Sequence, residues 1–441
     1  MIKYILIIII SLTILIKSNA QNDTCLSNLT LGISFPPVED DSQRIFAKTH
    51  LDFLNVTKIR FAENWASREP TQGNFNWQPL DDRINWAYNN GYEILLTIQS
   101  NAPDWACSLN QNGQSCVFND NNDFKNYIDL LLQRYPNKIS KIQFGNEWQS
   151  NYWYIGNANE FIAANNVLYT SVQFYSPSTQ VILGGFTTIS LRFLAGCNGY
   201  VNSFYDDDGF YYDSVYLTTN CATSTIQEVK NRIDSVLQYA QFDIIDLHFY
   251  DDVEQWDEYY LNFSDTISKP IIVSEFGGPN MNYEPYSDAF QVDRLYQYIK
   301  KLDSLQILEA YFFKLVEGTE NSAHSTSGLI DDTTLLEKPA YYLFKSFISC
   351  LTYIYEYNYA KHIKFYPNPM KDYTMMEFQN INQQNKKTIS IYGSNGQVVK
   401  TINNIYKNYY LLKRENITPG FYFIKVRDQS GVIAKGKLII N

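Results

Sequence analysis

Two glutamates follow short, β-branched stretches of the sequence. Glu147 comes after Lys141–Gly145 and Asn146, and Glu275 comes directly after Pro270–Ser274. Two carboxyl groups that flank a glycosidic bond can break it, because one protonates the leaving oxygen while the other attacks the anomeric carbon or activates water. A carboxylate also stabilises the positive charge of an oxocarbenium-like transition state. The pair is therefore a candidate for glycoside hydrolysis, provided that the fold brings both groups to one cleft.

Short apolar runs recur between residues 31 and 314, and amphipathic segments separate most of them. We predict strands at Leu31–Phe35, Lys58–Ala62, Glu93–Ile98, Lys141–Gly145, Gln180–Gly185, Asp243–Phe249, Pro270–Ser274 and Leu308–Phe313. We predict helices at Leu80–Asn89, Asp123–Tyr135, Glu160–Tyr175, Ile226–Tyr239 and Asp288–Leu302. Strands that alternate with helices indicate a parallel sheet, and eight such units fit a (β/α)8 TIM barrel. A doubly wound open sheet is the alternative, but no Gly-x-Gly-x-x-Gly motif follows the first strand.

The loops that follow the strands of such a barrel meet at one face, where the chemistry of the fold is found. Tryptophans are frequent in these loops, and their rings can stack on the apolar faces of sugars, although packing beneath a loop is the alternative for each. We predict that Trp65, Trp105 and Trp148 bind sugar. Trp153 and Trp256 also fall in or near these loops. The acidic segments Asp206–Asp208 and Asp251–Asp252 lack the spacing of an EF-hand and are interpreted as solvated loops. His50 and His324 receive no role, and no metal or cofactor is predicted.

The strand-end motifs resemble those of clan GH-A of the retaining glycoside hydrolases, over roughly residues 31–347. The resemblance implies that Glu147 is the acid/base, that Asn146 binds the sugar 2-hydroxyl and that Glu275 is the nucleophile. It further implies that Arg60 supports the nucleophile and that His248 and Tyr250 form hydrogen bonds near it.

Two other segments carry the same resemblance, and one departs from it. The run from Trp65 to Trp77 resembles the loop after the second strand in family 39 and its relatives, and Lys338–Tyr342 resembles the start of the last barrel helix. The clan usually has a tryptophan at the end of strand eight. This chain reads Ala310–Lys314 there, without one.

Charge divides the chain into two parts. Residues 361–441 carry 13 Lys and Arg but only 4 Asp and Glu, whereas residues 21–360 carry 20 basic and 42 acidic residues and all 7 Trp. The break predicts a domain boundary near residue 360. The net charge of −11 argues against nucleic acid as a partner, since phosphate binding favours a basic surface.

The basic tail contains short strand candidates separated by turn residues. Strands are predicted at Thr374–Phe378, Thr388–Tyr392, Phe421–Arg427 and Val432–Ile440, which together suggest a small all-β sandwich. The tail resembles the type A C-terminal sorting domain of type IX secretion in Bacteroidota. The resemblance rests on Tyr366-Pro-Asn-Pro369, on the Ile-Tyr-x-x-x-Gly-Gln turn at 391–397 and on the Pro-Gly-x-Tyr-x-Ile strand at 419–424. A carbohydrate-binding module is the alternative, but the tail has no Trp to form a sugar platform.

The N-terminus has the form of a secretory signal peptide. Lys3 precedes the apolar run Tyr4–Ile16, and Ser18-Asn-Ala20 supplies the small residues of a cleavage site. A buried strand is the alternative. No other run of about 18 apolar residues occurs, so we expect no transmembrane segment in the mature protein.

Six cysteines in an exported chain indicate disulfides, with buried free thiols as the alternative. Proximity in the sequence favours Cys107–Cys116 and Cys197–Cys221, and Cys25–Cys350 would then join the two ends of one domain.

These observations predict a signal peptide at 1–20, a catalytic (β/α)8 barrel at 21–358 and a β-sandwich sorting domain at 361–441. The expected protein is a secreted or cell-surface monomer that hydrolyses β-linked poly- or oligosaccharides with retention and that contacts the type IX secretion machinery. The alternative is a non-catalytic carbohydrate-binding protein or adhesin. It is favoured by the missing strand-eight Trp and opposed by the intact glutamate pair.

Overall fold

The computed structural model describes residues 24–111, 115–282, 285–318, 324–350, 361–378, 386–393, 397–428 and 431–441. The chain forms two compact units, Met1–Tyr353 and Ile354–Asn441. The predicted signal peptide and the predicted domain boundary both lie outside the described residues.

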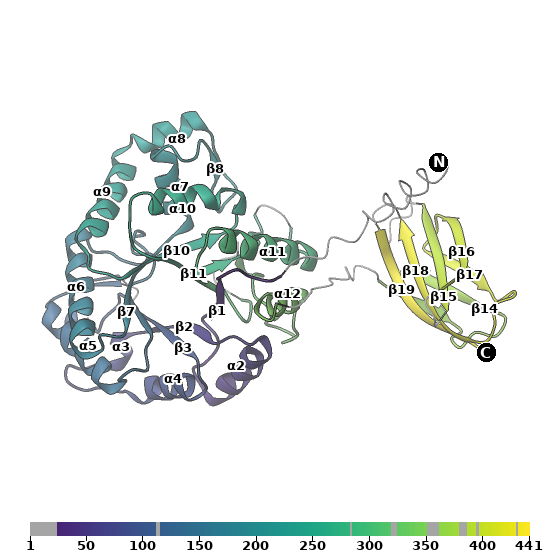
Figure 1. Cartoon of the computed structure of the whole chain (residues 1–441), viewed down its shortest axis with the longest axis horizontal. Helices are drawn as coiled ribbons and strands as arrows, with labels where there is room; N and C mark the ends of the chain where they lie inside the picture. Colours follow the sequence, from purple (N-terminus) through teal and green to yellow (C-terminus); the bar gives the residue numbers. More distant parts are fainter. Residues whose placement is uncertain are drawn as a thin grey trace, which may run out of the picture. The chain divides into compact units, whose positions relative to one another are not determined.

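Eight parallel strands close into a barrel in the first unit, and helices surround it (Figure 1). Around the barrel the strands are β1 (Thr30–Ser34), β12 (Glu309–Phe312), β11 (Ile271–Gly277), β10 (Ile244–Tyr250), β7 (Gln180–Phe186), β6 (Lys141–Phe144), β3 (Glu93–Ile98) and β2 (Lys58–Glu63). Each of the eight predicted strands overlaps one of them. The prediction of a (β/α)8 barrel is confirmed.

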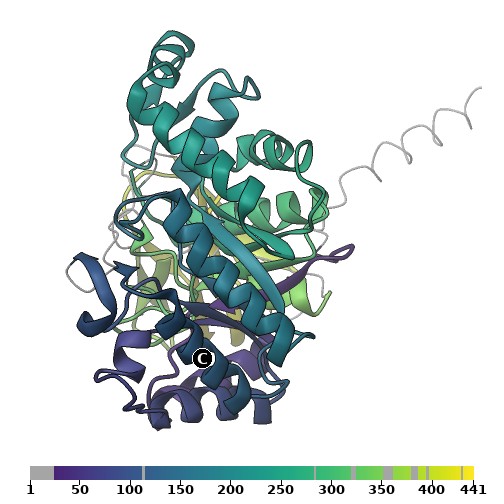
Figure 2. The same ribbon diagram turned by 90° about the vertical axis from the view of Figure 1, so that its left-hand side faces the viewer.

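The helices form the outer layer of the barrel (Figures 1 and 2). They include α2 (Asp41–Leu54), α4 (Gln78–Asn89), α5 (Asn121–Arg134), α6 (Ala158–Tyr175), α9 (Ser224–Tyr239), α11 (Asp288–Ser304) and α12 (Pro339–Ile348). Local sequence fixes where they begin. Asn157 and Glu160 form a reciprocal capping box at the start of α6, and the Asp120 side chain accepts a hydrogen bond from the Asn122 N–H at the start of α5.

The inside of the barrel is packed in layers. An apolar layer is formed by Leu95, Ile182, Ile244, Ile272 and Tyr311, which lie on five different strands. An ionic layer lies toward the amino ends of the strands. There the Glu309 carboxylate accepts from Lys141 Nζ at 2.9 Å and from Lys58 Nζ at 3.3 Å. Tyr311 joins the two layers, because its hydroxyl donates to Glu309.

Two of the loops that follow barrel strands contain a segment closed by a disulfide. Cys107–Cys116 joins the hairpin of β4 (Cys107–Gln111) and β5 (Ser115–Phe118), which follows β3. Cys197–Cys221 joins the ends of α7 (Thr188–Cys197) and α8 (Ser214–Cys221), which follow β7. Cys25–Cys350 joins the two ends of the barrel unit. All three predicted pairings are confirmed.

The second unit is all-β, as predicted. Its strands are β13 (Lys361–Tyr366), β14 (Tyr373–Phe378), β15 (Lys387–Gly393), β16 (Val398–Ile405), β17 (Tyr409–Lys413), β18 (Gly420–Asp428) and β19 (Gly431–Ile440). They pair in the order β16-β15-β18-β19-β13-β14-β17, and β13 pairs with β19 through its first residues and with β14 through its last. Among the described residues, no helix is both long enough and apolar enough to span a membrane.

Candidate active site

Glu147 and Glu275 line one cleft at the carboxyl ends of the barrel strands. The cleft has a volume of about 630 Å³. A carboxylate oxygen of Glu147 and one of Glu275 lie within 4.8 Å of each other. The barrel therefore brings together two groups that stand 128 positions apart in the sequence.

Glu275, at the end of β11, is held by two hydrogen-bond donors. Arg60 Nη1 donates to its Oε1 at 2.5 Å, and the Tyr250 hydroxyl donates to its Oε2 at 2.7 Å. Burial favours the protonated carboxyl, but the positive charges of His248 and Arg60 and the two hydrogen bonds outweigh it and hold the pKa of Glu275 below its ordinary value. Glu275 is therefore a carboxylate at neutral pH.

Arg60 is fixed by neighbouring strands before any ligand arrives. Its side chain is fully buried, and Nε donates to the Thr97 hydroxyl on β3. Nη1 also donates to Ser34 on β1, and Nη2 donates to Oδ1 of Asn146 after β6. The guanidinium thus links Glu275 to Asn146, the residue that precedes Glu147.

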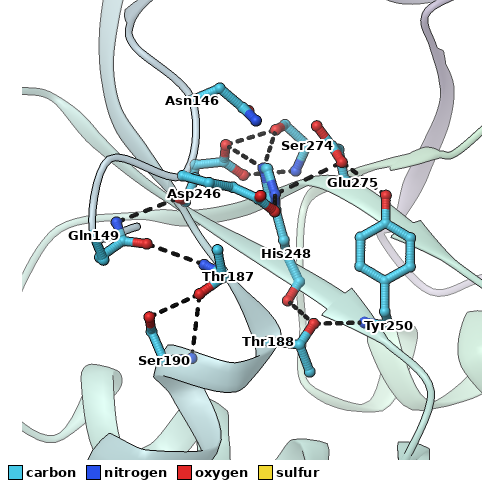
Figure 3. Close-up of polar contacts among 12 residues, drawn as sticks. Asn146, Gln149, Thr187, Thr188, Ser190, Asp246, His248, Tyr250, Ser274 and Glu275 are labelled. Atoms are coloured by element: carbon cyan, nitrogen blue, oxygen red, sulfur yellow. Dashed lines mark hydrogen bonds and ion pairs between the residues drawn. The ribbon is translucent and has the colours of Figure 1, made fainter. Parts of the chain in front are cut away.

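His248, on β10, lies between Glu275 and a buried network of Asp246 and Ser274 (Figure 3), and it also contacts Glu147. Its Nδ1 lies 2.8 Å from Oε1 of Glu147 and 3.7 Å from Oε2 of Glu275. Its Nε2 lies 3.2 Å from the Ser274 hydroxyl and 3.3 Å from Oδ2 of Asp246. Burial lowers the pKa of His248, but the charges of Glu275 and Asp246 and the hydrogen bonds to Asp246 and Glu147 raise it to about 10. His248 is therefore an imidazolium that donates from both ring nitrogens.

Two features of the backbone allow this network to form. A Cβ on Gly185 of β7 would meet Nε2 of His248 at 1.9 Å, and one on Gly184 would meet Cβ of Asp246 at 2.3 Å, so only glycine leaves room for these side chains. Glu147 itself has φ +46°, in the left-handed region, where a side chain other than glycine is strained. Strain of this kind is typical of functional positions held by their surroundings.

Glu147, His248 and Glu275 also have the spacing of a three-ligand metal site. A histidine must be neutral to bind a metal ion, so a metal ion here would have to displace the proton of His248. That the protein uses no metal stays a prediction.

The three predicted sugar-binding tryptophans do not lie in the cleft. Trp65 and Trp148 are fully buried and cannot present a ring face to a sugar. Trp65 packs against Trp105 and Tyr127, and Trp148 packs against Phe161 and Phe186. Trp105 is half-buried and donates through Nε1 to the Glu69 carbonyl. The expectation is corrected for Trp65 and Trp148, whose rings support the loops from beneath, whereas sugar binding by Trp105 stays a prediction.

Other aromatic rings line the cleft in their place. Phe313 directly follows β12, where the clan usually has a tryptophan, and its ring meets Phe35 and Tyr250 edge-on at 6.0 Å. Tyr152 and Trp153, in the loop after β6, line the cleft from another side. An aromatic lining is therefore present, but different residues supply it.

The structure places three further residues differently from the expectations drawn from the sequence. Asp207 lines the cleft and pairs with the buried Arg192, with Oδ1 2.7 Å from Nη1. His324, which received no role, is buried beside Tyr250 with 4.6 Å between ring centroids. Asp251 is also buried, where it accepts from Arg294 and Tyr298, so it does not belong to a solvated loop.

Comparison with known proteins gives two family matches and two fungal relatives. The profile described as "Glycosyl hydrolase catalytic core" matches residues 218–342, and the profile described as "Secretion system C-terminal sorting domain" matches residues 364–441. Endo-1,4-beta-xylanase 1 of Gibberella zeae is 26% identical over 209 residues, which cover 46% of this chain and 52% of the relative. Endo-1,4-beta-xylanase A of Fusarium oxysporum f. sp. lycopersici is 31% identical over 91 residues, or 20% of this chain and 26% of the relative. The chain thus matches about half of one relative and a quarter of the other.

Solved structures share the fold at low identity. A GH39 enzyme from Xanthomonas axonopodis pv. citri superposes with a TM-score of 0.53 at 11% identity, over 86% of this chain and 82% of that one. An exo-beta-1,4-mannosidase from an Opitutaceae bacterium superposes with a TM-score of 0.51 at 12% identity, over 76% of this chain and 62% of that one.

The resemblance stated from the sequence is therefore confirmed in both of its parts. The C-terminal match marks the chain for export through type IX secretion, in agreement with the three disulfides. The chain thus combines an eight-stranded barrel, of which residues 218–342 match a glycosyl hydrolase catalytic core, with a C-terminal segment that matches a secretion system sorting domain.

Proposed function

We propose that the protein is a secreted retaining glycoside hydrolase that cleaves β-glycosidic bonds of a poly- or oligosaccharide by double displacement. The observation that carries the proposal is the glutamate pair in one cleft, with carboxylate oxygens within 4.8 Å of each other. Retaining enzymes hold their carboxyl groups about 5–5.5 Å apart, whereas inverting enzymes leave about 6.5–9.5 Å for a water molecule. The separation supports retention.

In the first step, a carboxylate oxygen of Glu275 attacks the anomeric carbon while the bond from that carbon to the leaving oxygen breaks. Glu147 gives its proton to the leaving oxygen, so a glycosyl ester of Glu275 and a free alcohol are formed. Arg60 and Tyr250 hold the nucleophile ionised and oriented. We assign the 2-hydroxyl of the sugar to Asn146, whose amide is oriented by Arg60.

In the second step, water attacks the same carbon and gives its proton to Glu147, while the ester bond to Glu275 breaks. Two inversions at one carbon release a sugar with its original configuration. His248 contacts Glu147 and lies near Glu275, so we assign it the role of positioning the acid/base beside the nucleophile.

The substrate class is proposed from the cleft and the relatives together. Phe313, Phe35 and Trp153 offer apolar faces for sugar rings, while the carboxylates offer partners for hydroxyl groups. Both fungal relatives are endo-1,4-beta-xylanases, so β-1,4-linked xylan is the first polysaccharide to test.

The experiment is a reducing-sugar assay with xylan, mannan, mixed-linkage glucan and algal polysaccharides, run in parallel with Glu275→Gln. Release of sugar by the wild type but not by the variant supports the proposal. If the wild type binds one polysaccharide tightly and hydrolyses none of them, the protein is the non-catalytic binder instead.

We further propose that the mature protein is a monomer and that residues 364–441 are its contact with the type IX secretion machinery. A variant of the protein that lacks residues 364–441 should remain in the periplasm. Sedimentation of the mature protein should give the mass of one chain.

A further inference from the structure

The segment closed by Cys197–Cys221 forms part of the cleft wall. This aromatic insertion, residues 198–220, follows β7 and contains the hairpin of β8 (Phe204–Tyr205) and β9 (Tyr211–Tyr212) (Figure 1). Its tip contributes Asp207 to the cleft. The insertion is therefore continuous with the site of the proposed reaction.

The tip is anchored firmly to the barrel. Oδ1 of Asp207 pairs with Arg192, whose side chain is fully buried. The Asp207 carbonyl accepts from Nδ2 of Asn280 at 2.9 Å and from Nδ2 of Asn282 at 2.7 Å, both in the loop after β11. The insertion is thus tied at its base by a disulfide and at its tip by an ion pair and two hydrogen bonds.

The two faces of the hairpin have different surroundings. Phe204 and Tyr212 are paired across the strands, and each ring meets Phe193 of α7 at 5.2 Å. Successive side chains of a strand point to opposite faces, so the pair Tyr205 and Tyr211 lies on the other side. These two rings are 4.8 Å apart and are 50% and 48% exposed.

Two further exposed rings lie on the side of the hairpin that carries Tyr212. Phe210 is 50% exposed and Tyr216, on α8, is 46% exposed, and their ring centroids lie 5.0 Å and 5.3 Å from that of Tyr212. Exposed aromatic clusters on a rigid scaffold mark interaction sites, because tyrosine offers a large contact area at low cost in conformational entropy. Here the disulfide, the anchored tip and the Asp206 side chain, which accepts from the Asp208 and Phe210 N–H groups, supply that rigidity.

We propose that the exposed pair Tyr205 and Tyr211 binds the part of a glycan chain that extends out of the cleft past Asp207. The inference rests on the proposed function and makes it more specific, because it assigns a polymeric rather than a small substrate. Asp207 lies in the turn just beyond β8, two residues after Tyr205, and two residues of chain span at most about 7 Å. A glycan that leaves the cleft there therefore reaches the tyrosine pair within a few sugar units. Sugar rings present apolar faces to the tyrosine rings and hydroxyl groups to the phenol oxygens.

The test compares a polymer with a small substrate. The variant Tyr205→Ala/Tyr211→Ala should lose about tenfold in kcat/KM on the polysaccharide that the wild type hydrolyses. It should retain kcat/KM on the 4-nitrophenyl glycoside of the same sugar, which ends inside the cleft. Tyr205→Phe/Tyr211→Phe should retain most of the polymer activity, because the rings remain.

Phe174→Ala/Tyr239→Ala is the matched control, since these rings are exposed on α6 and α9. It should leave both activities unchanged, and all variants should share the melting temperature of the wild type. Unchanged polymer activity in Tyr205→Ala/Tyr211→Ala would overturn the proposal, and so would an equal loss on both substrates, which indicates a change in the cleft itself.

The surface can also be tested without turnover. Glu275→Gln should be retarded in gels that contain the polysaccharide, and adding the two tyrosine substitutions should restore free migration. If the wild type hydrolyses nothing but this retardation is observed, the proposed function fails while the glycan surface stands. Retardation that is independent of both tyrosines means that the surface serves a protein partner or none, and the proposal is wrong.

Discussion

Each end of the barrel holds a largely buried carboxylate next to cationic side chains, but the two carboxylates have different roles. Near the amino ends of the strands, Glu309 is paired with Lys141 and Lys58, and Lys58 also binds Glu93. At the carboxyl ends, Glu275 is paired with Arg60 and Tyr250. Burial opposes ionisation at both glutamates, and neighbouring cations still lower the pKa of each. An ionised buried glutamate is therefore not in itself evidence of catalysis.

The difference lies in what each carboxylate faces. Glu309 is enclosed by lysines from β2 and β6, so the charges neutralise one another within the fold. Glu275 faces a cleft of about 630 Å³ that it shares with Glu147. A second acid across an open space turns a structural ion pair into a candidate reaction site.

The largest effect is expected for Glu275→Ala. Removal of the nucleophile should lower kcat by roughly 10⁴-fold or more on every substrate. Added azide should restore part of the rate, because it enters the vacated space and attacks the anomeric carbon, and the glycosyl azide should have inverted configuration. Full activity in this variant would remove Glu275 from the mechanism.

A smaller and more selective loss is expected for Glu147→Ala. General acid catalysis contributes about 10²–10⁴-fold, and a leaving group that departs without a proton does not need it. The first step should slow strongly with the natural polymer and little with a 2,4-dinitrophenyl glycoside. Equal losses on both substrates would contradict the acid/base assignment.

The pH dependence of the free energy of unfolding should reveal whether His248 is protonated in the folded protein. Its pKa is about 10 in the folded protein, above the ordinary value of 6.5. Its contribution to stability is therefore fully present below pH 6.5 and is lost as the pH rises through about 10.

Urea melts of the wild type and of His248→Asn, which does not titrate, should isolate this contribution. Their difference in free energy of unfolding should shrink by roughly 4 kcal/mol between pH 6.5 and pH 10. A difference that is constant over this range would show that His248 is neutral in the folded protein.

The smallest effect on activity is expected at the other end of the barrel. Glu309→Gln should leave kcat/KM unchanged and should lower the free energy of unfolding by about 1–3 kcal/mol, because Lys141 loses its carboxylate partner and Lys58 keeps only Glu93. The pKa of Glu309 lies below its ordinary 4.5 in the folded protein, so its contribution is present above pH 4.5 and is lost as the pH falls through the folded value. If Glu309→Gln lost activity but kept the stability of the wild type, the assignment of a purely structural role to Glu309 would be wrong.

Sequence patterns predicted the barrel because parallel strands are buried on both faces and therefore appear as apolar runs. They predicted the glutamates because strand ends meet at one face of the barrel. Strands β16 and β17 of the tail were not predicted, since most of their side chains alternate between exposed and half-buried positions and leave a weak apolar pattern.

The aromatic lining was not predictable, because composition does not distinguish a ring beneath a loop from a ring above it. Trp65 and Phe313 both follow a barrel strand, and only packing places the first in the core and the second in the cleft. The sequence also carries a signal for the buried network. Gly184 and Gly185 stand together inside a strand, which indicates the close approach of another group, and His248 and Asp246 are that group.

The most direct test of the account is proton NMR of the first product released by the wild type, recorded before mutarotation. Double displacement through Glu275 predicts that the β-anomer of the new reducing end appears first from a β-linked substrate and only later equilibrates. Initial release of the α-anomer would show a single displacement by water and would contradict the assignment of Glu275 as the nucleophile.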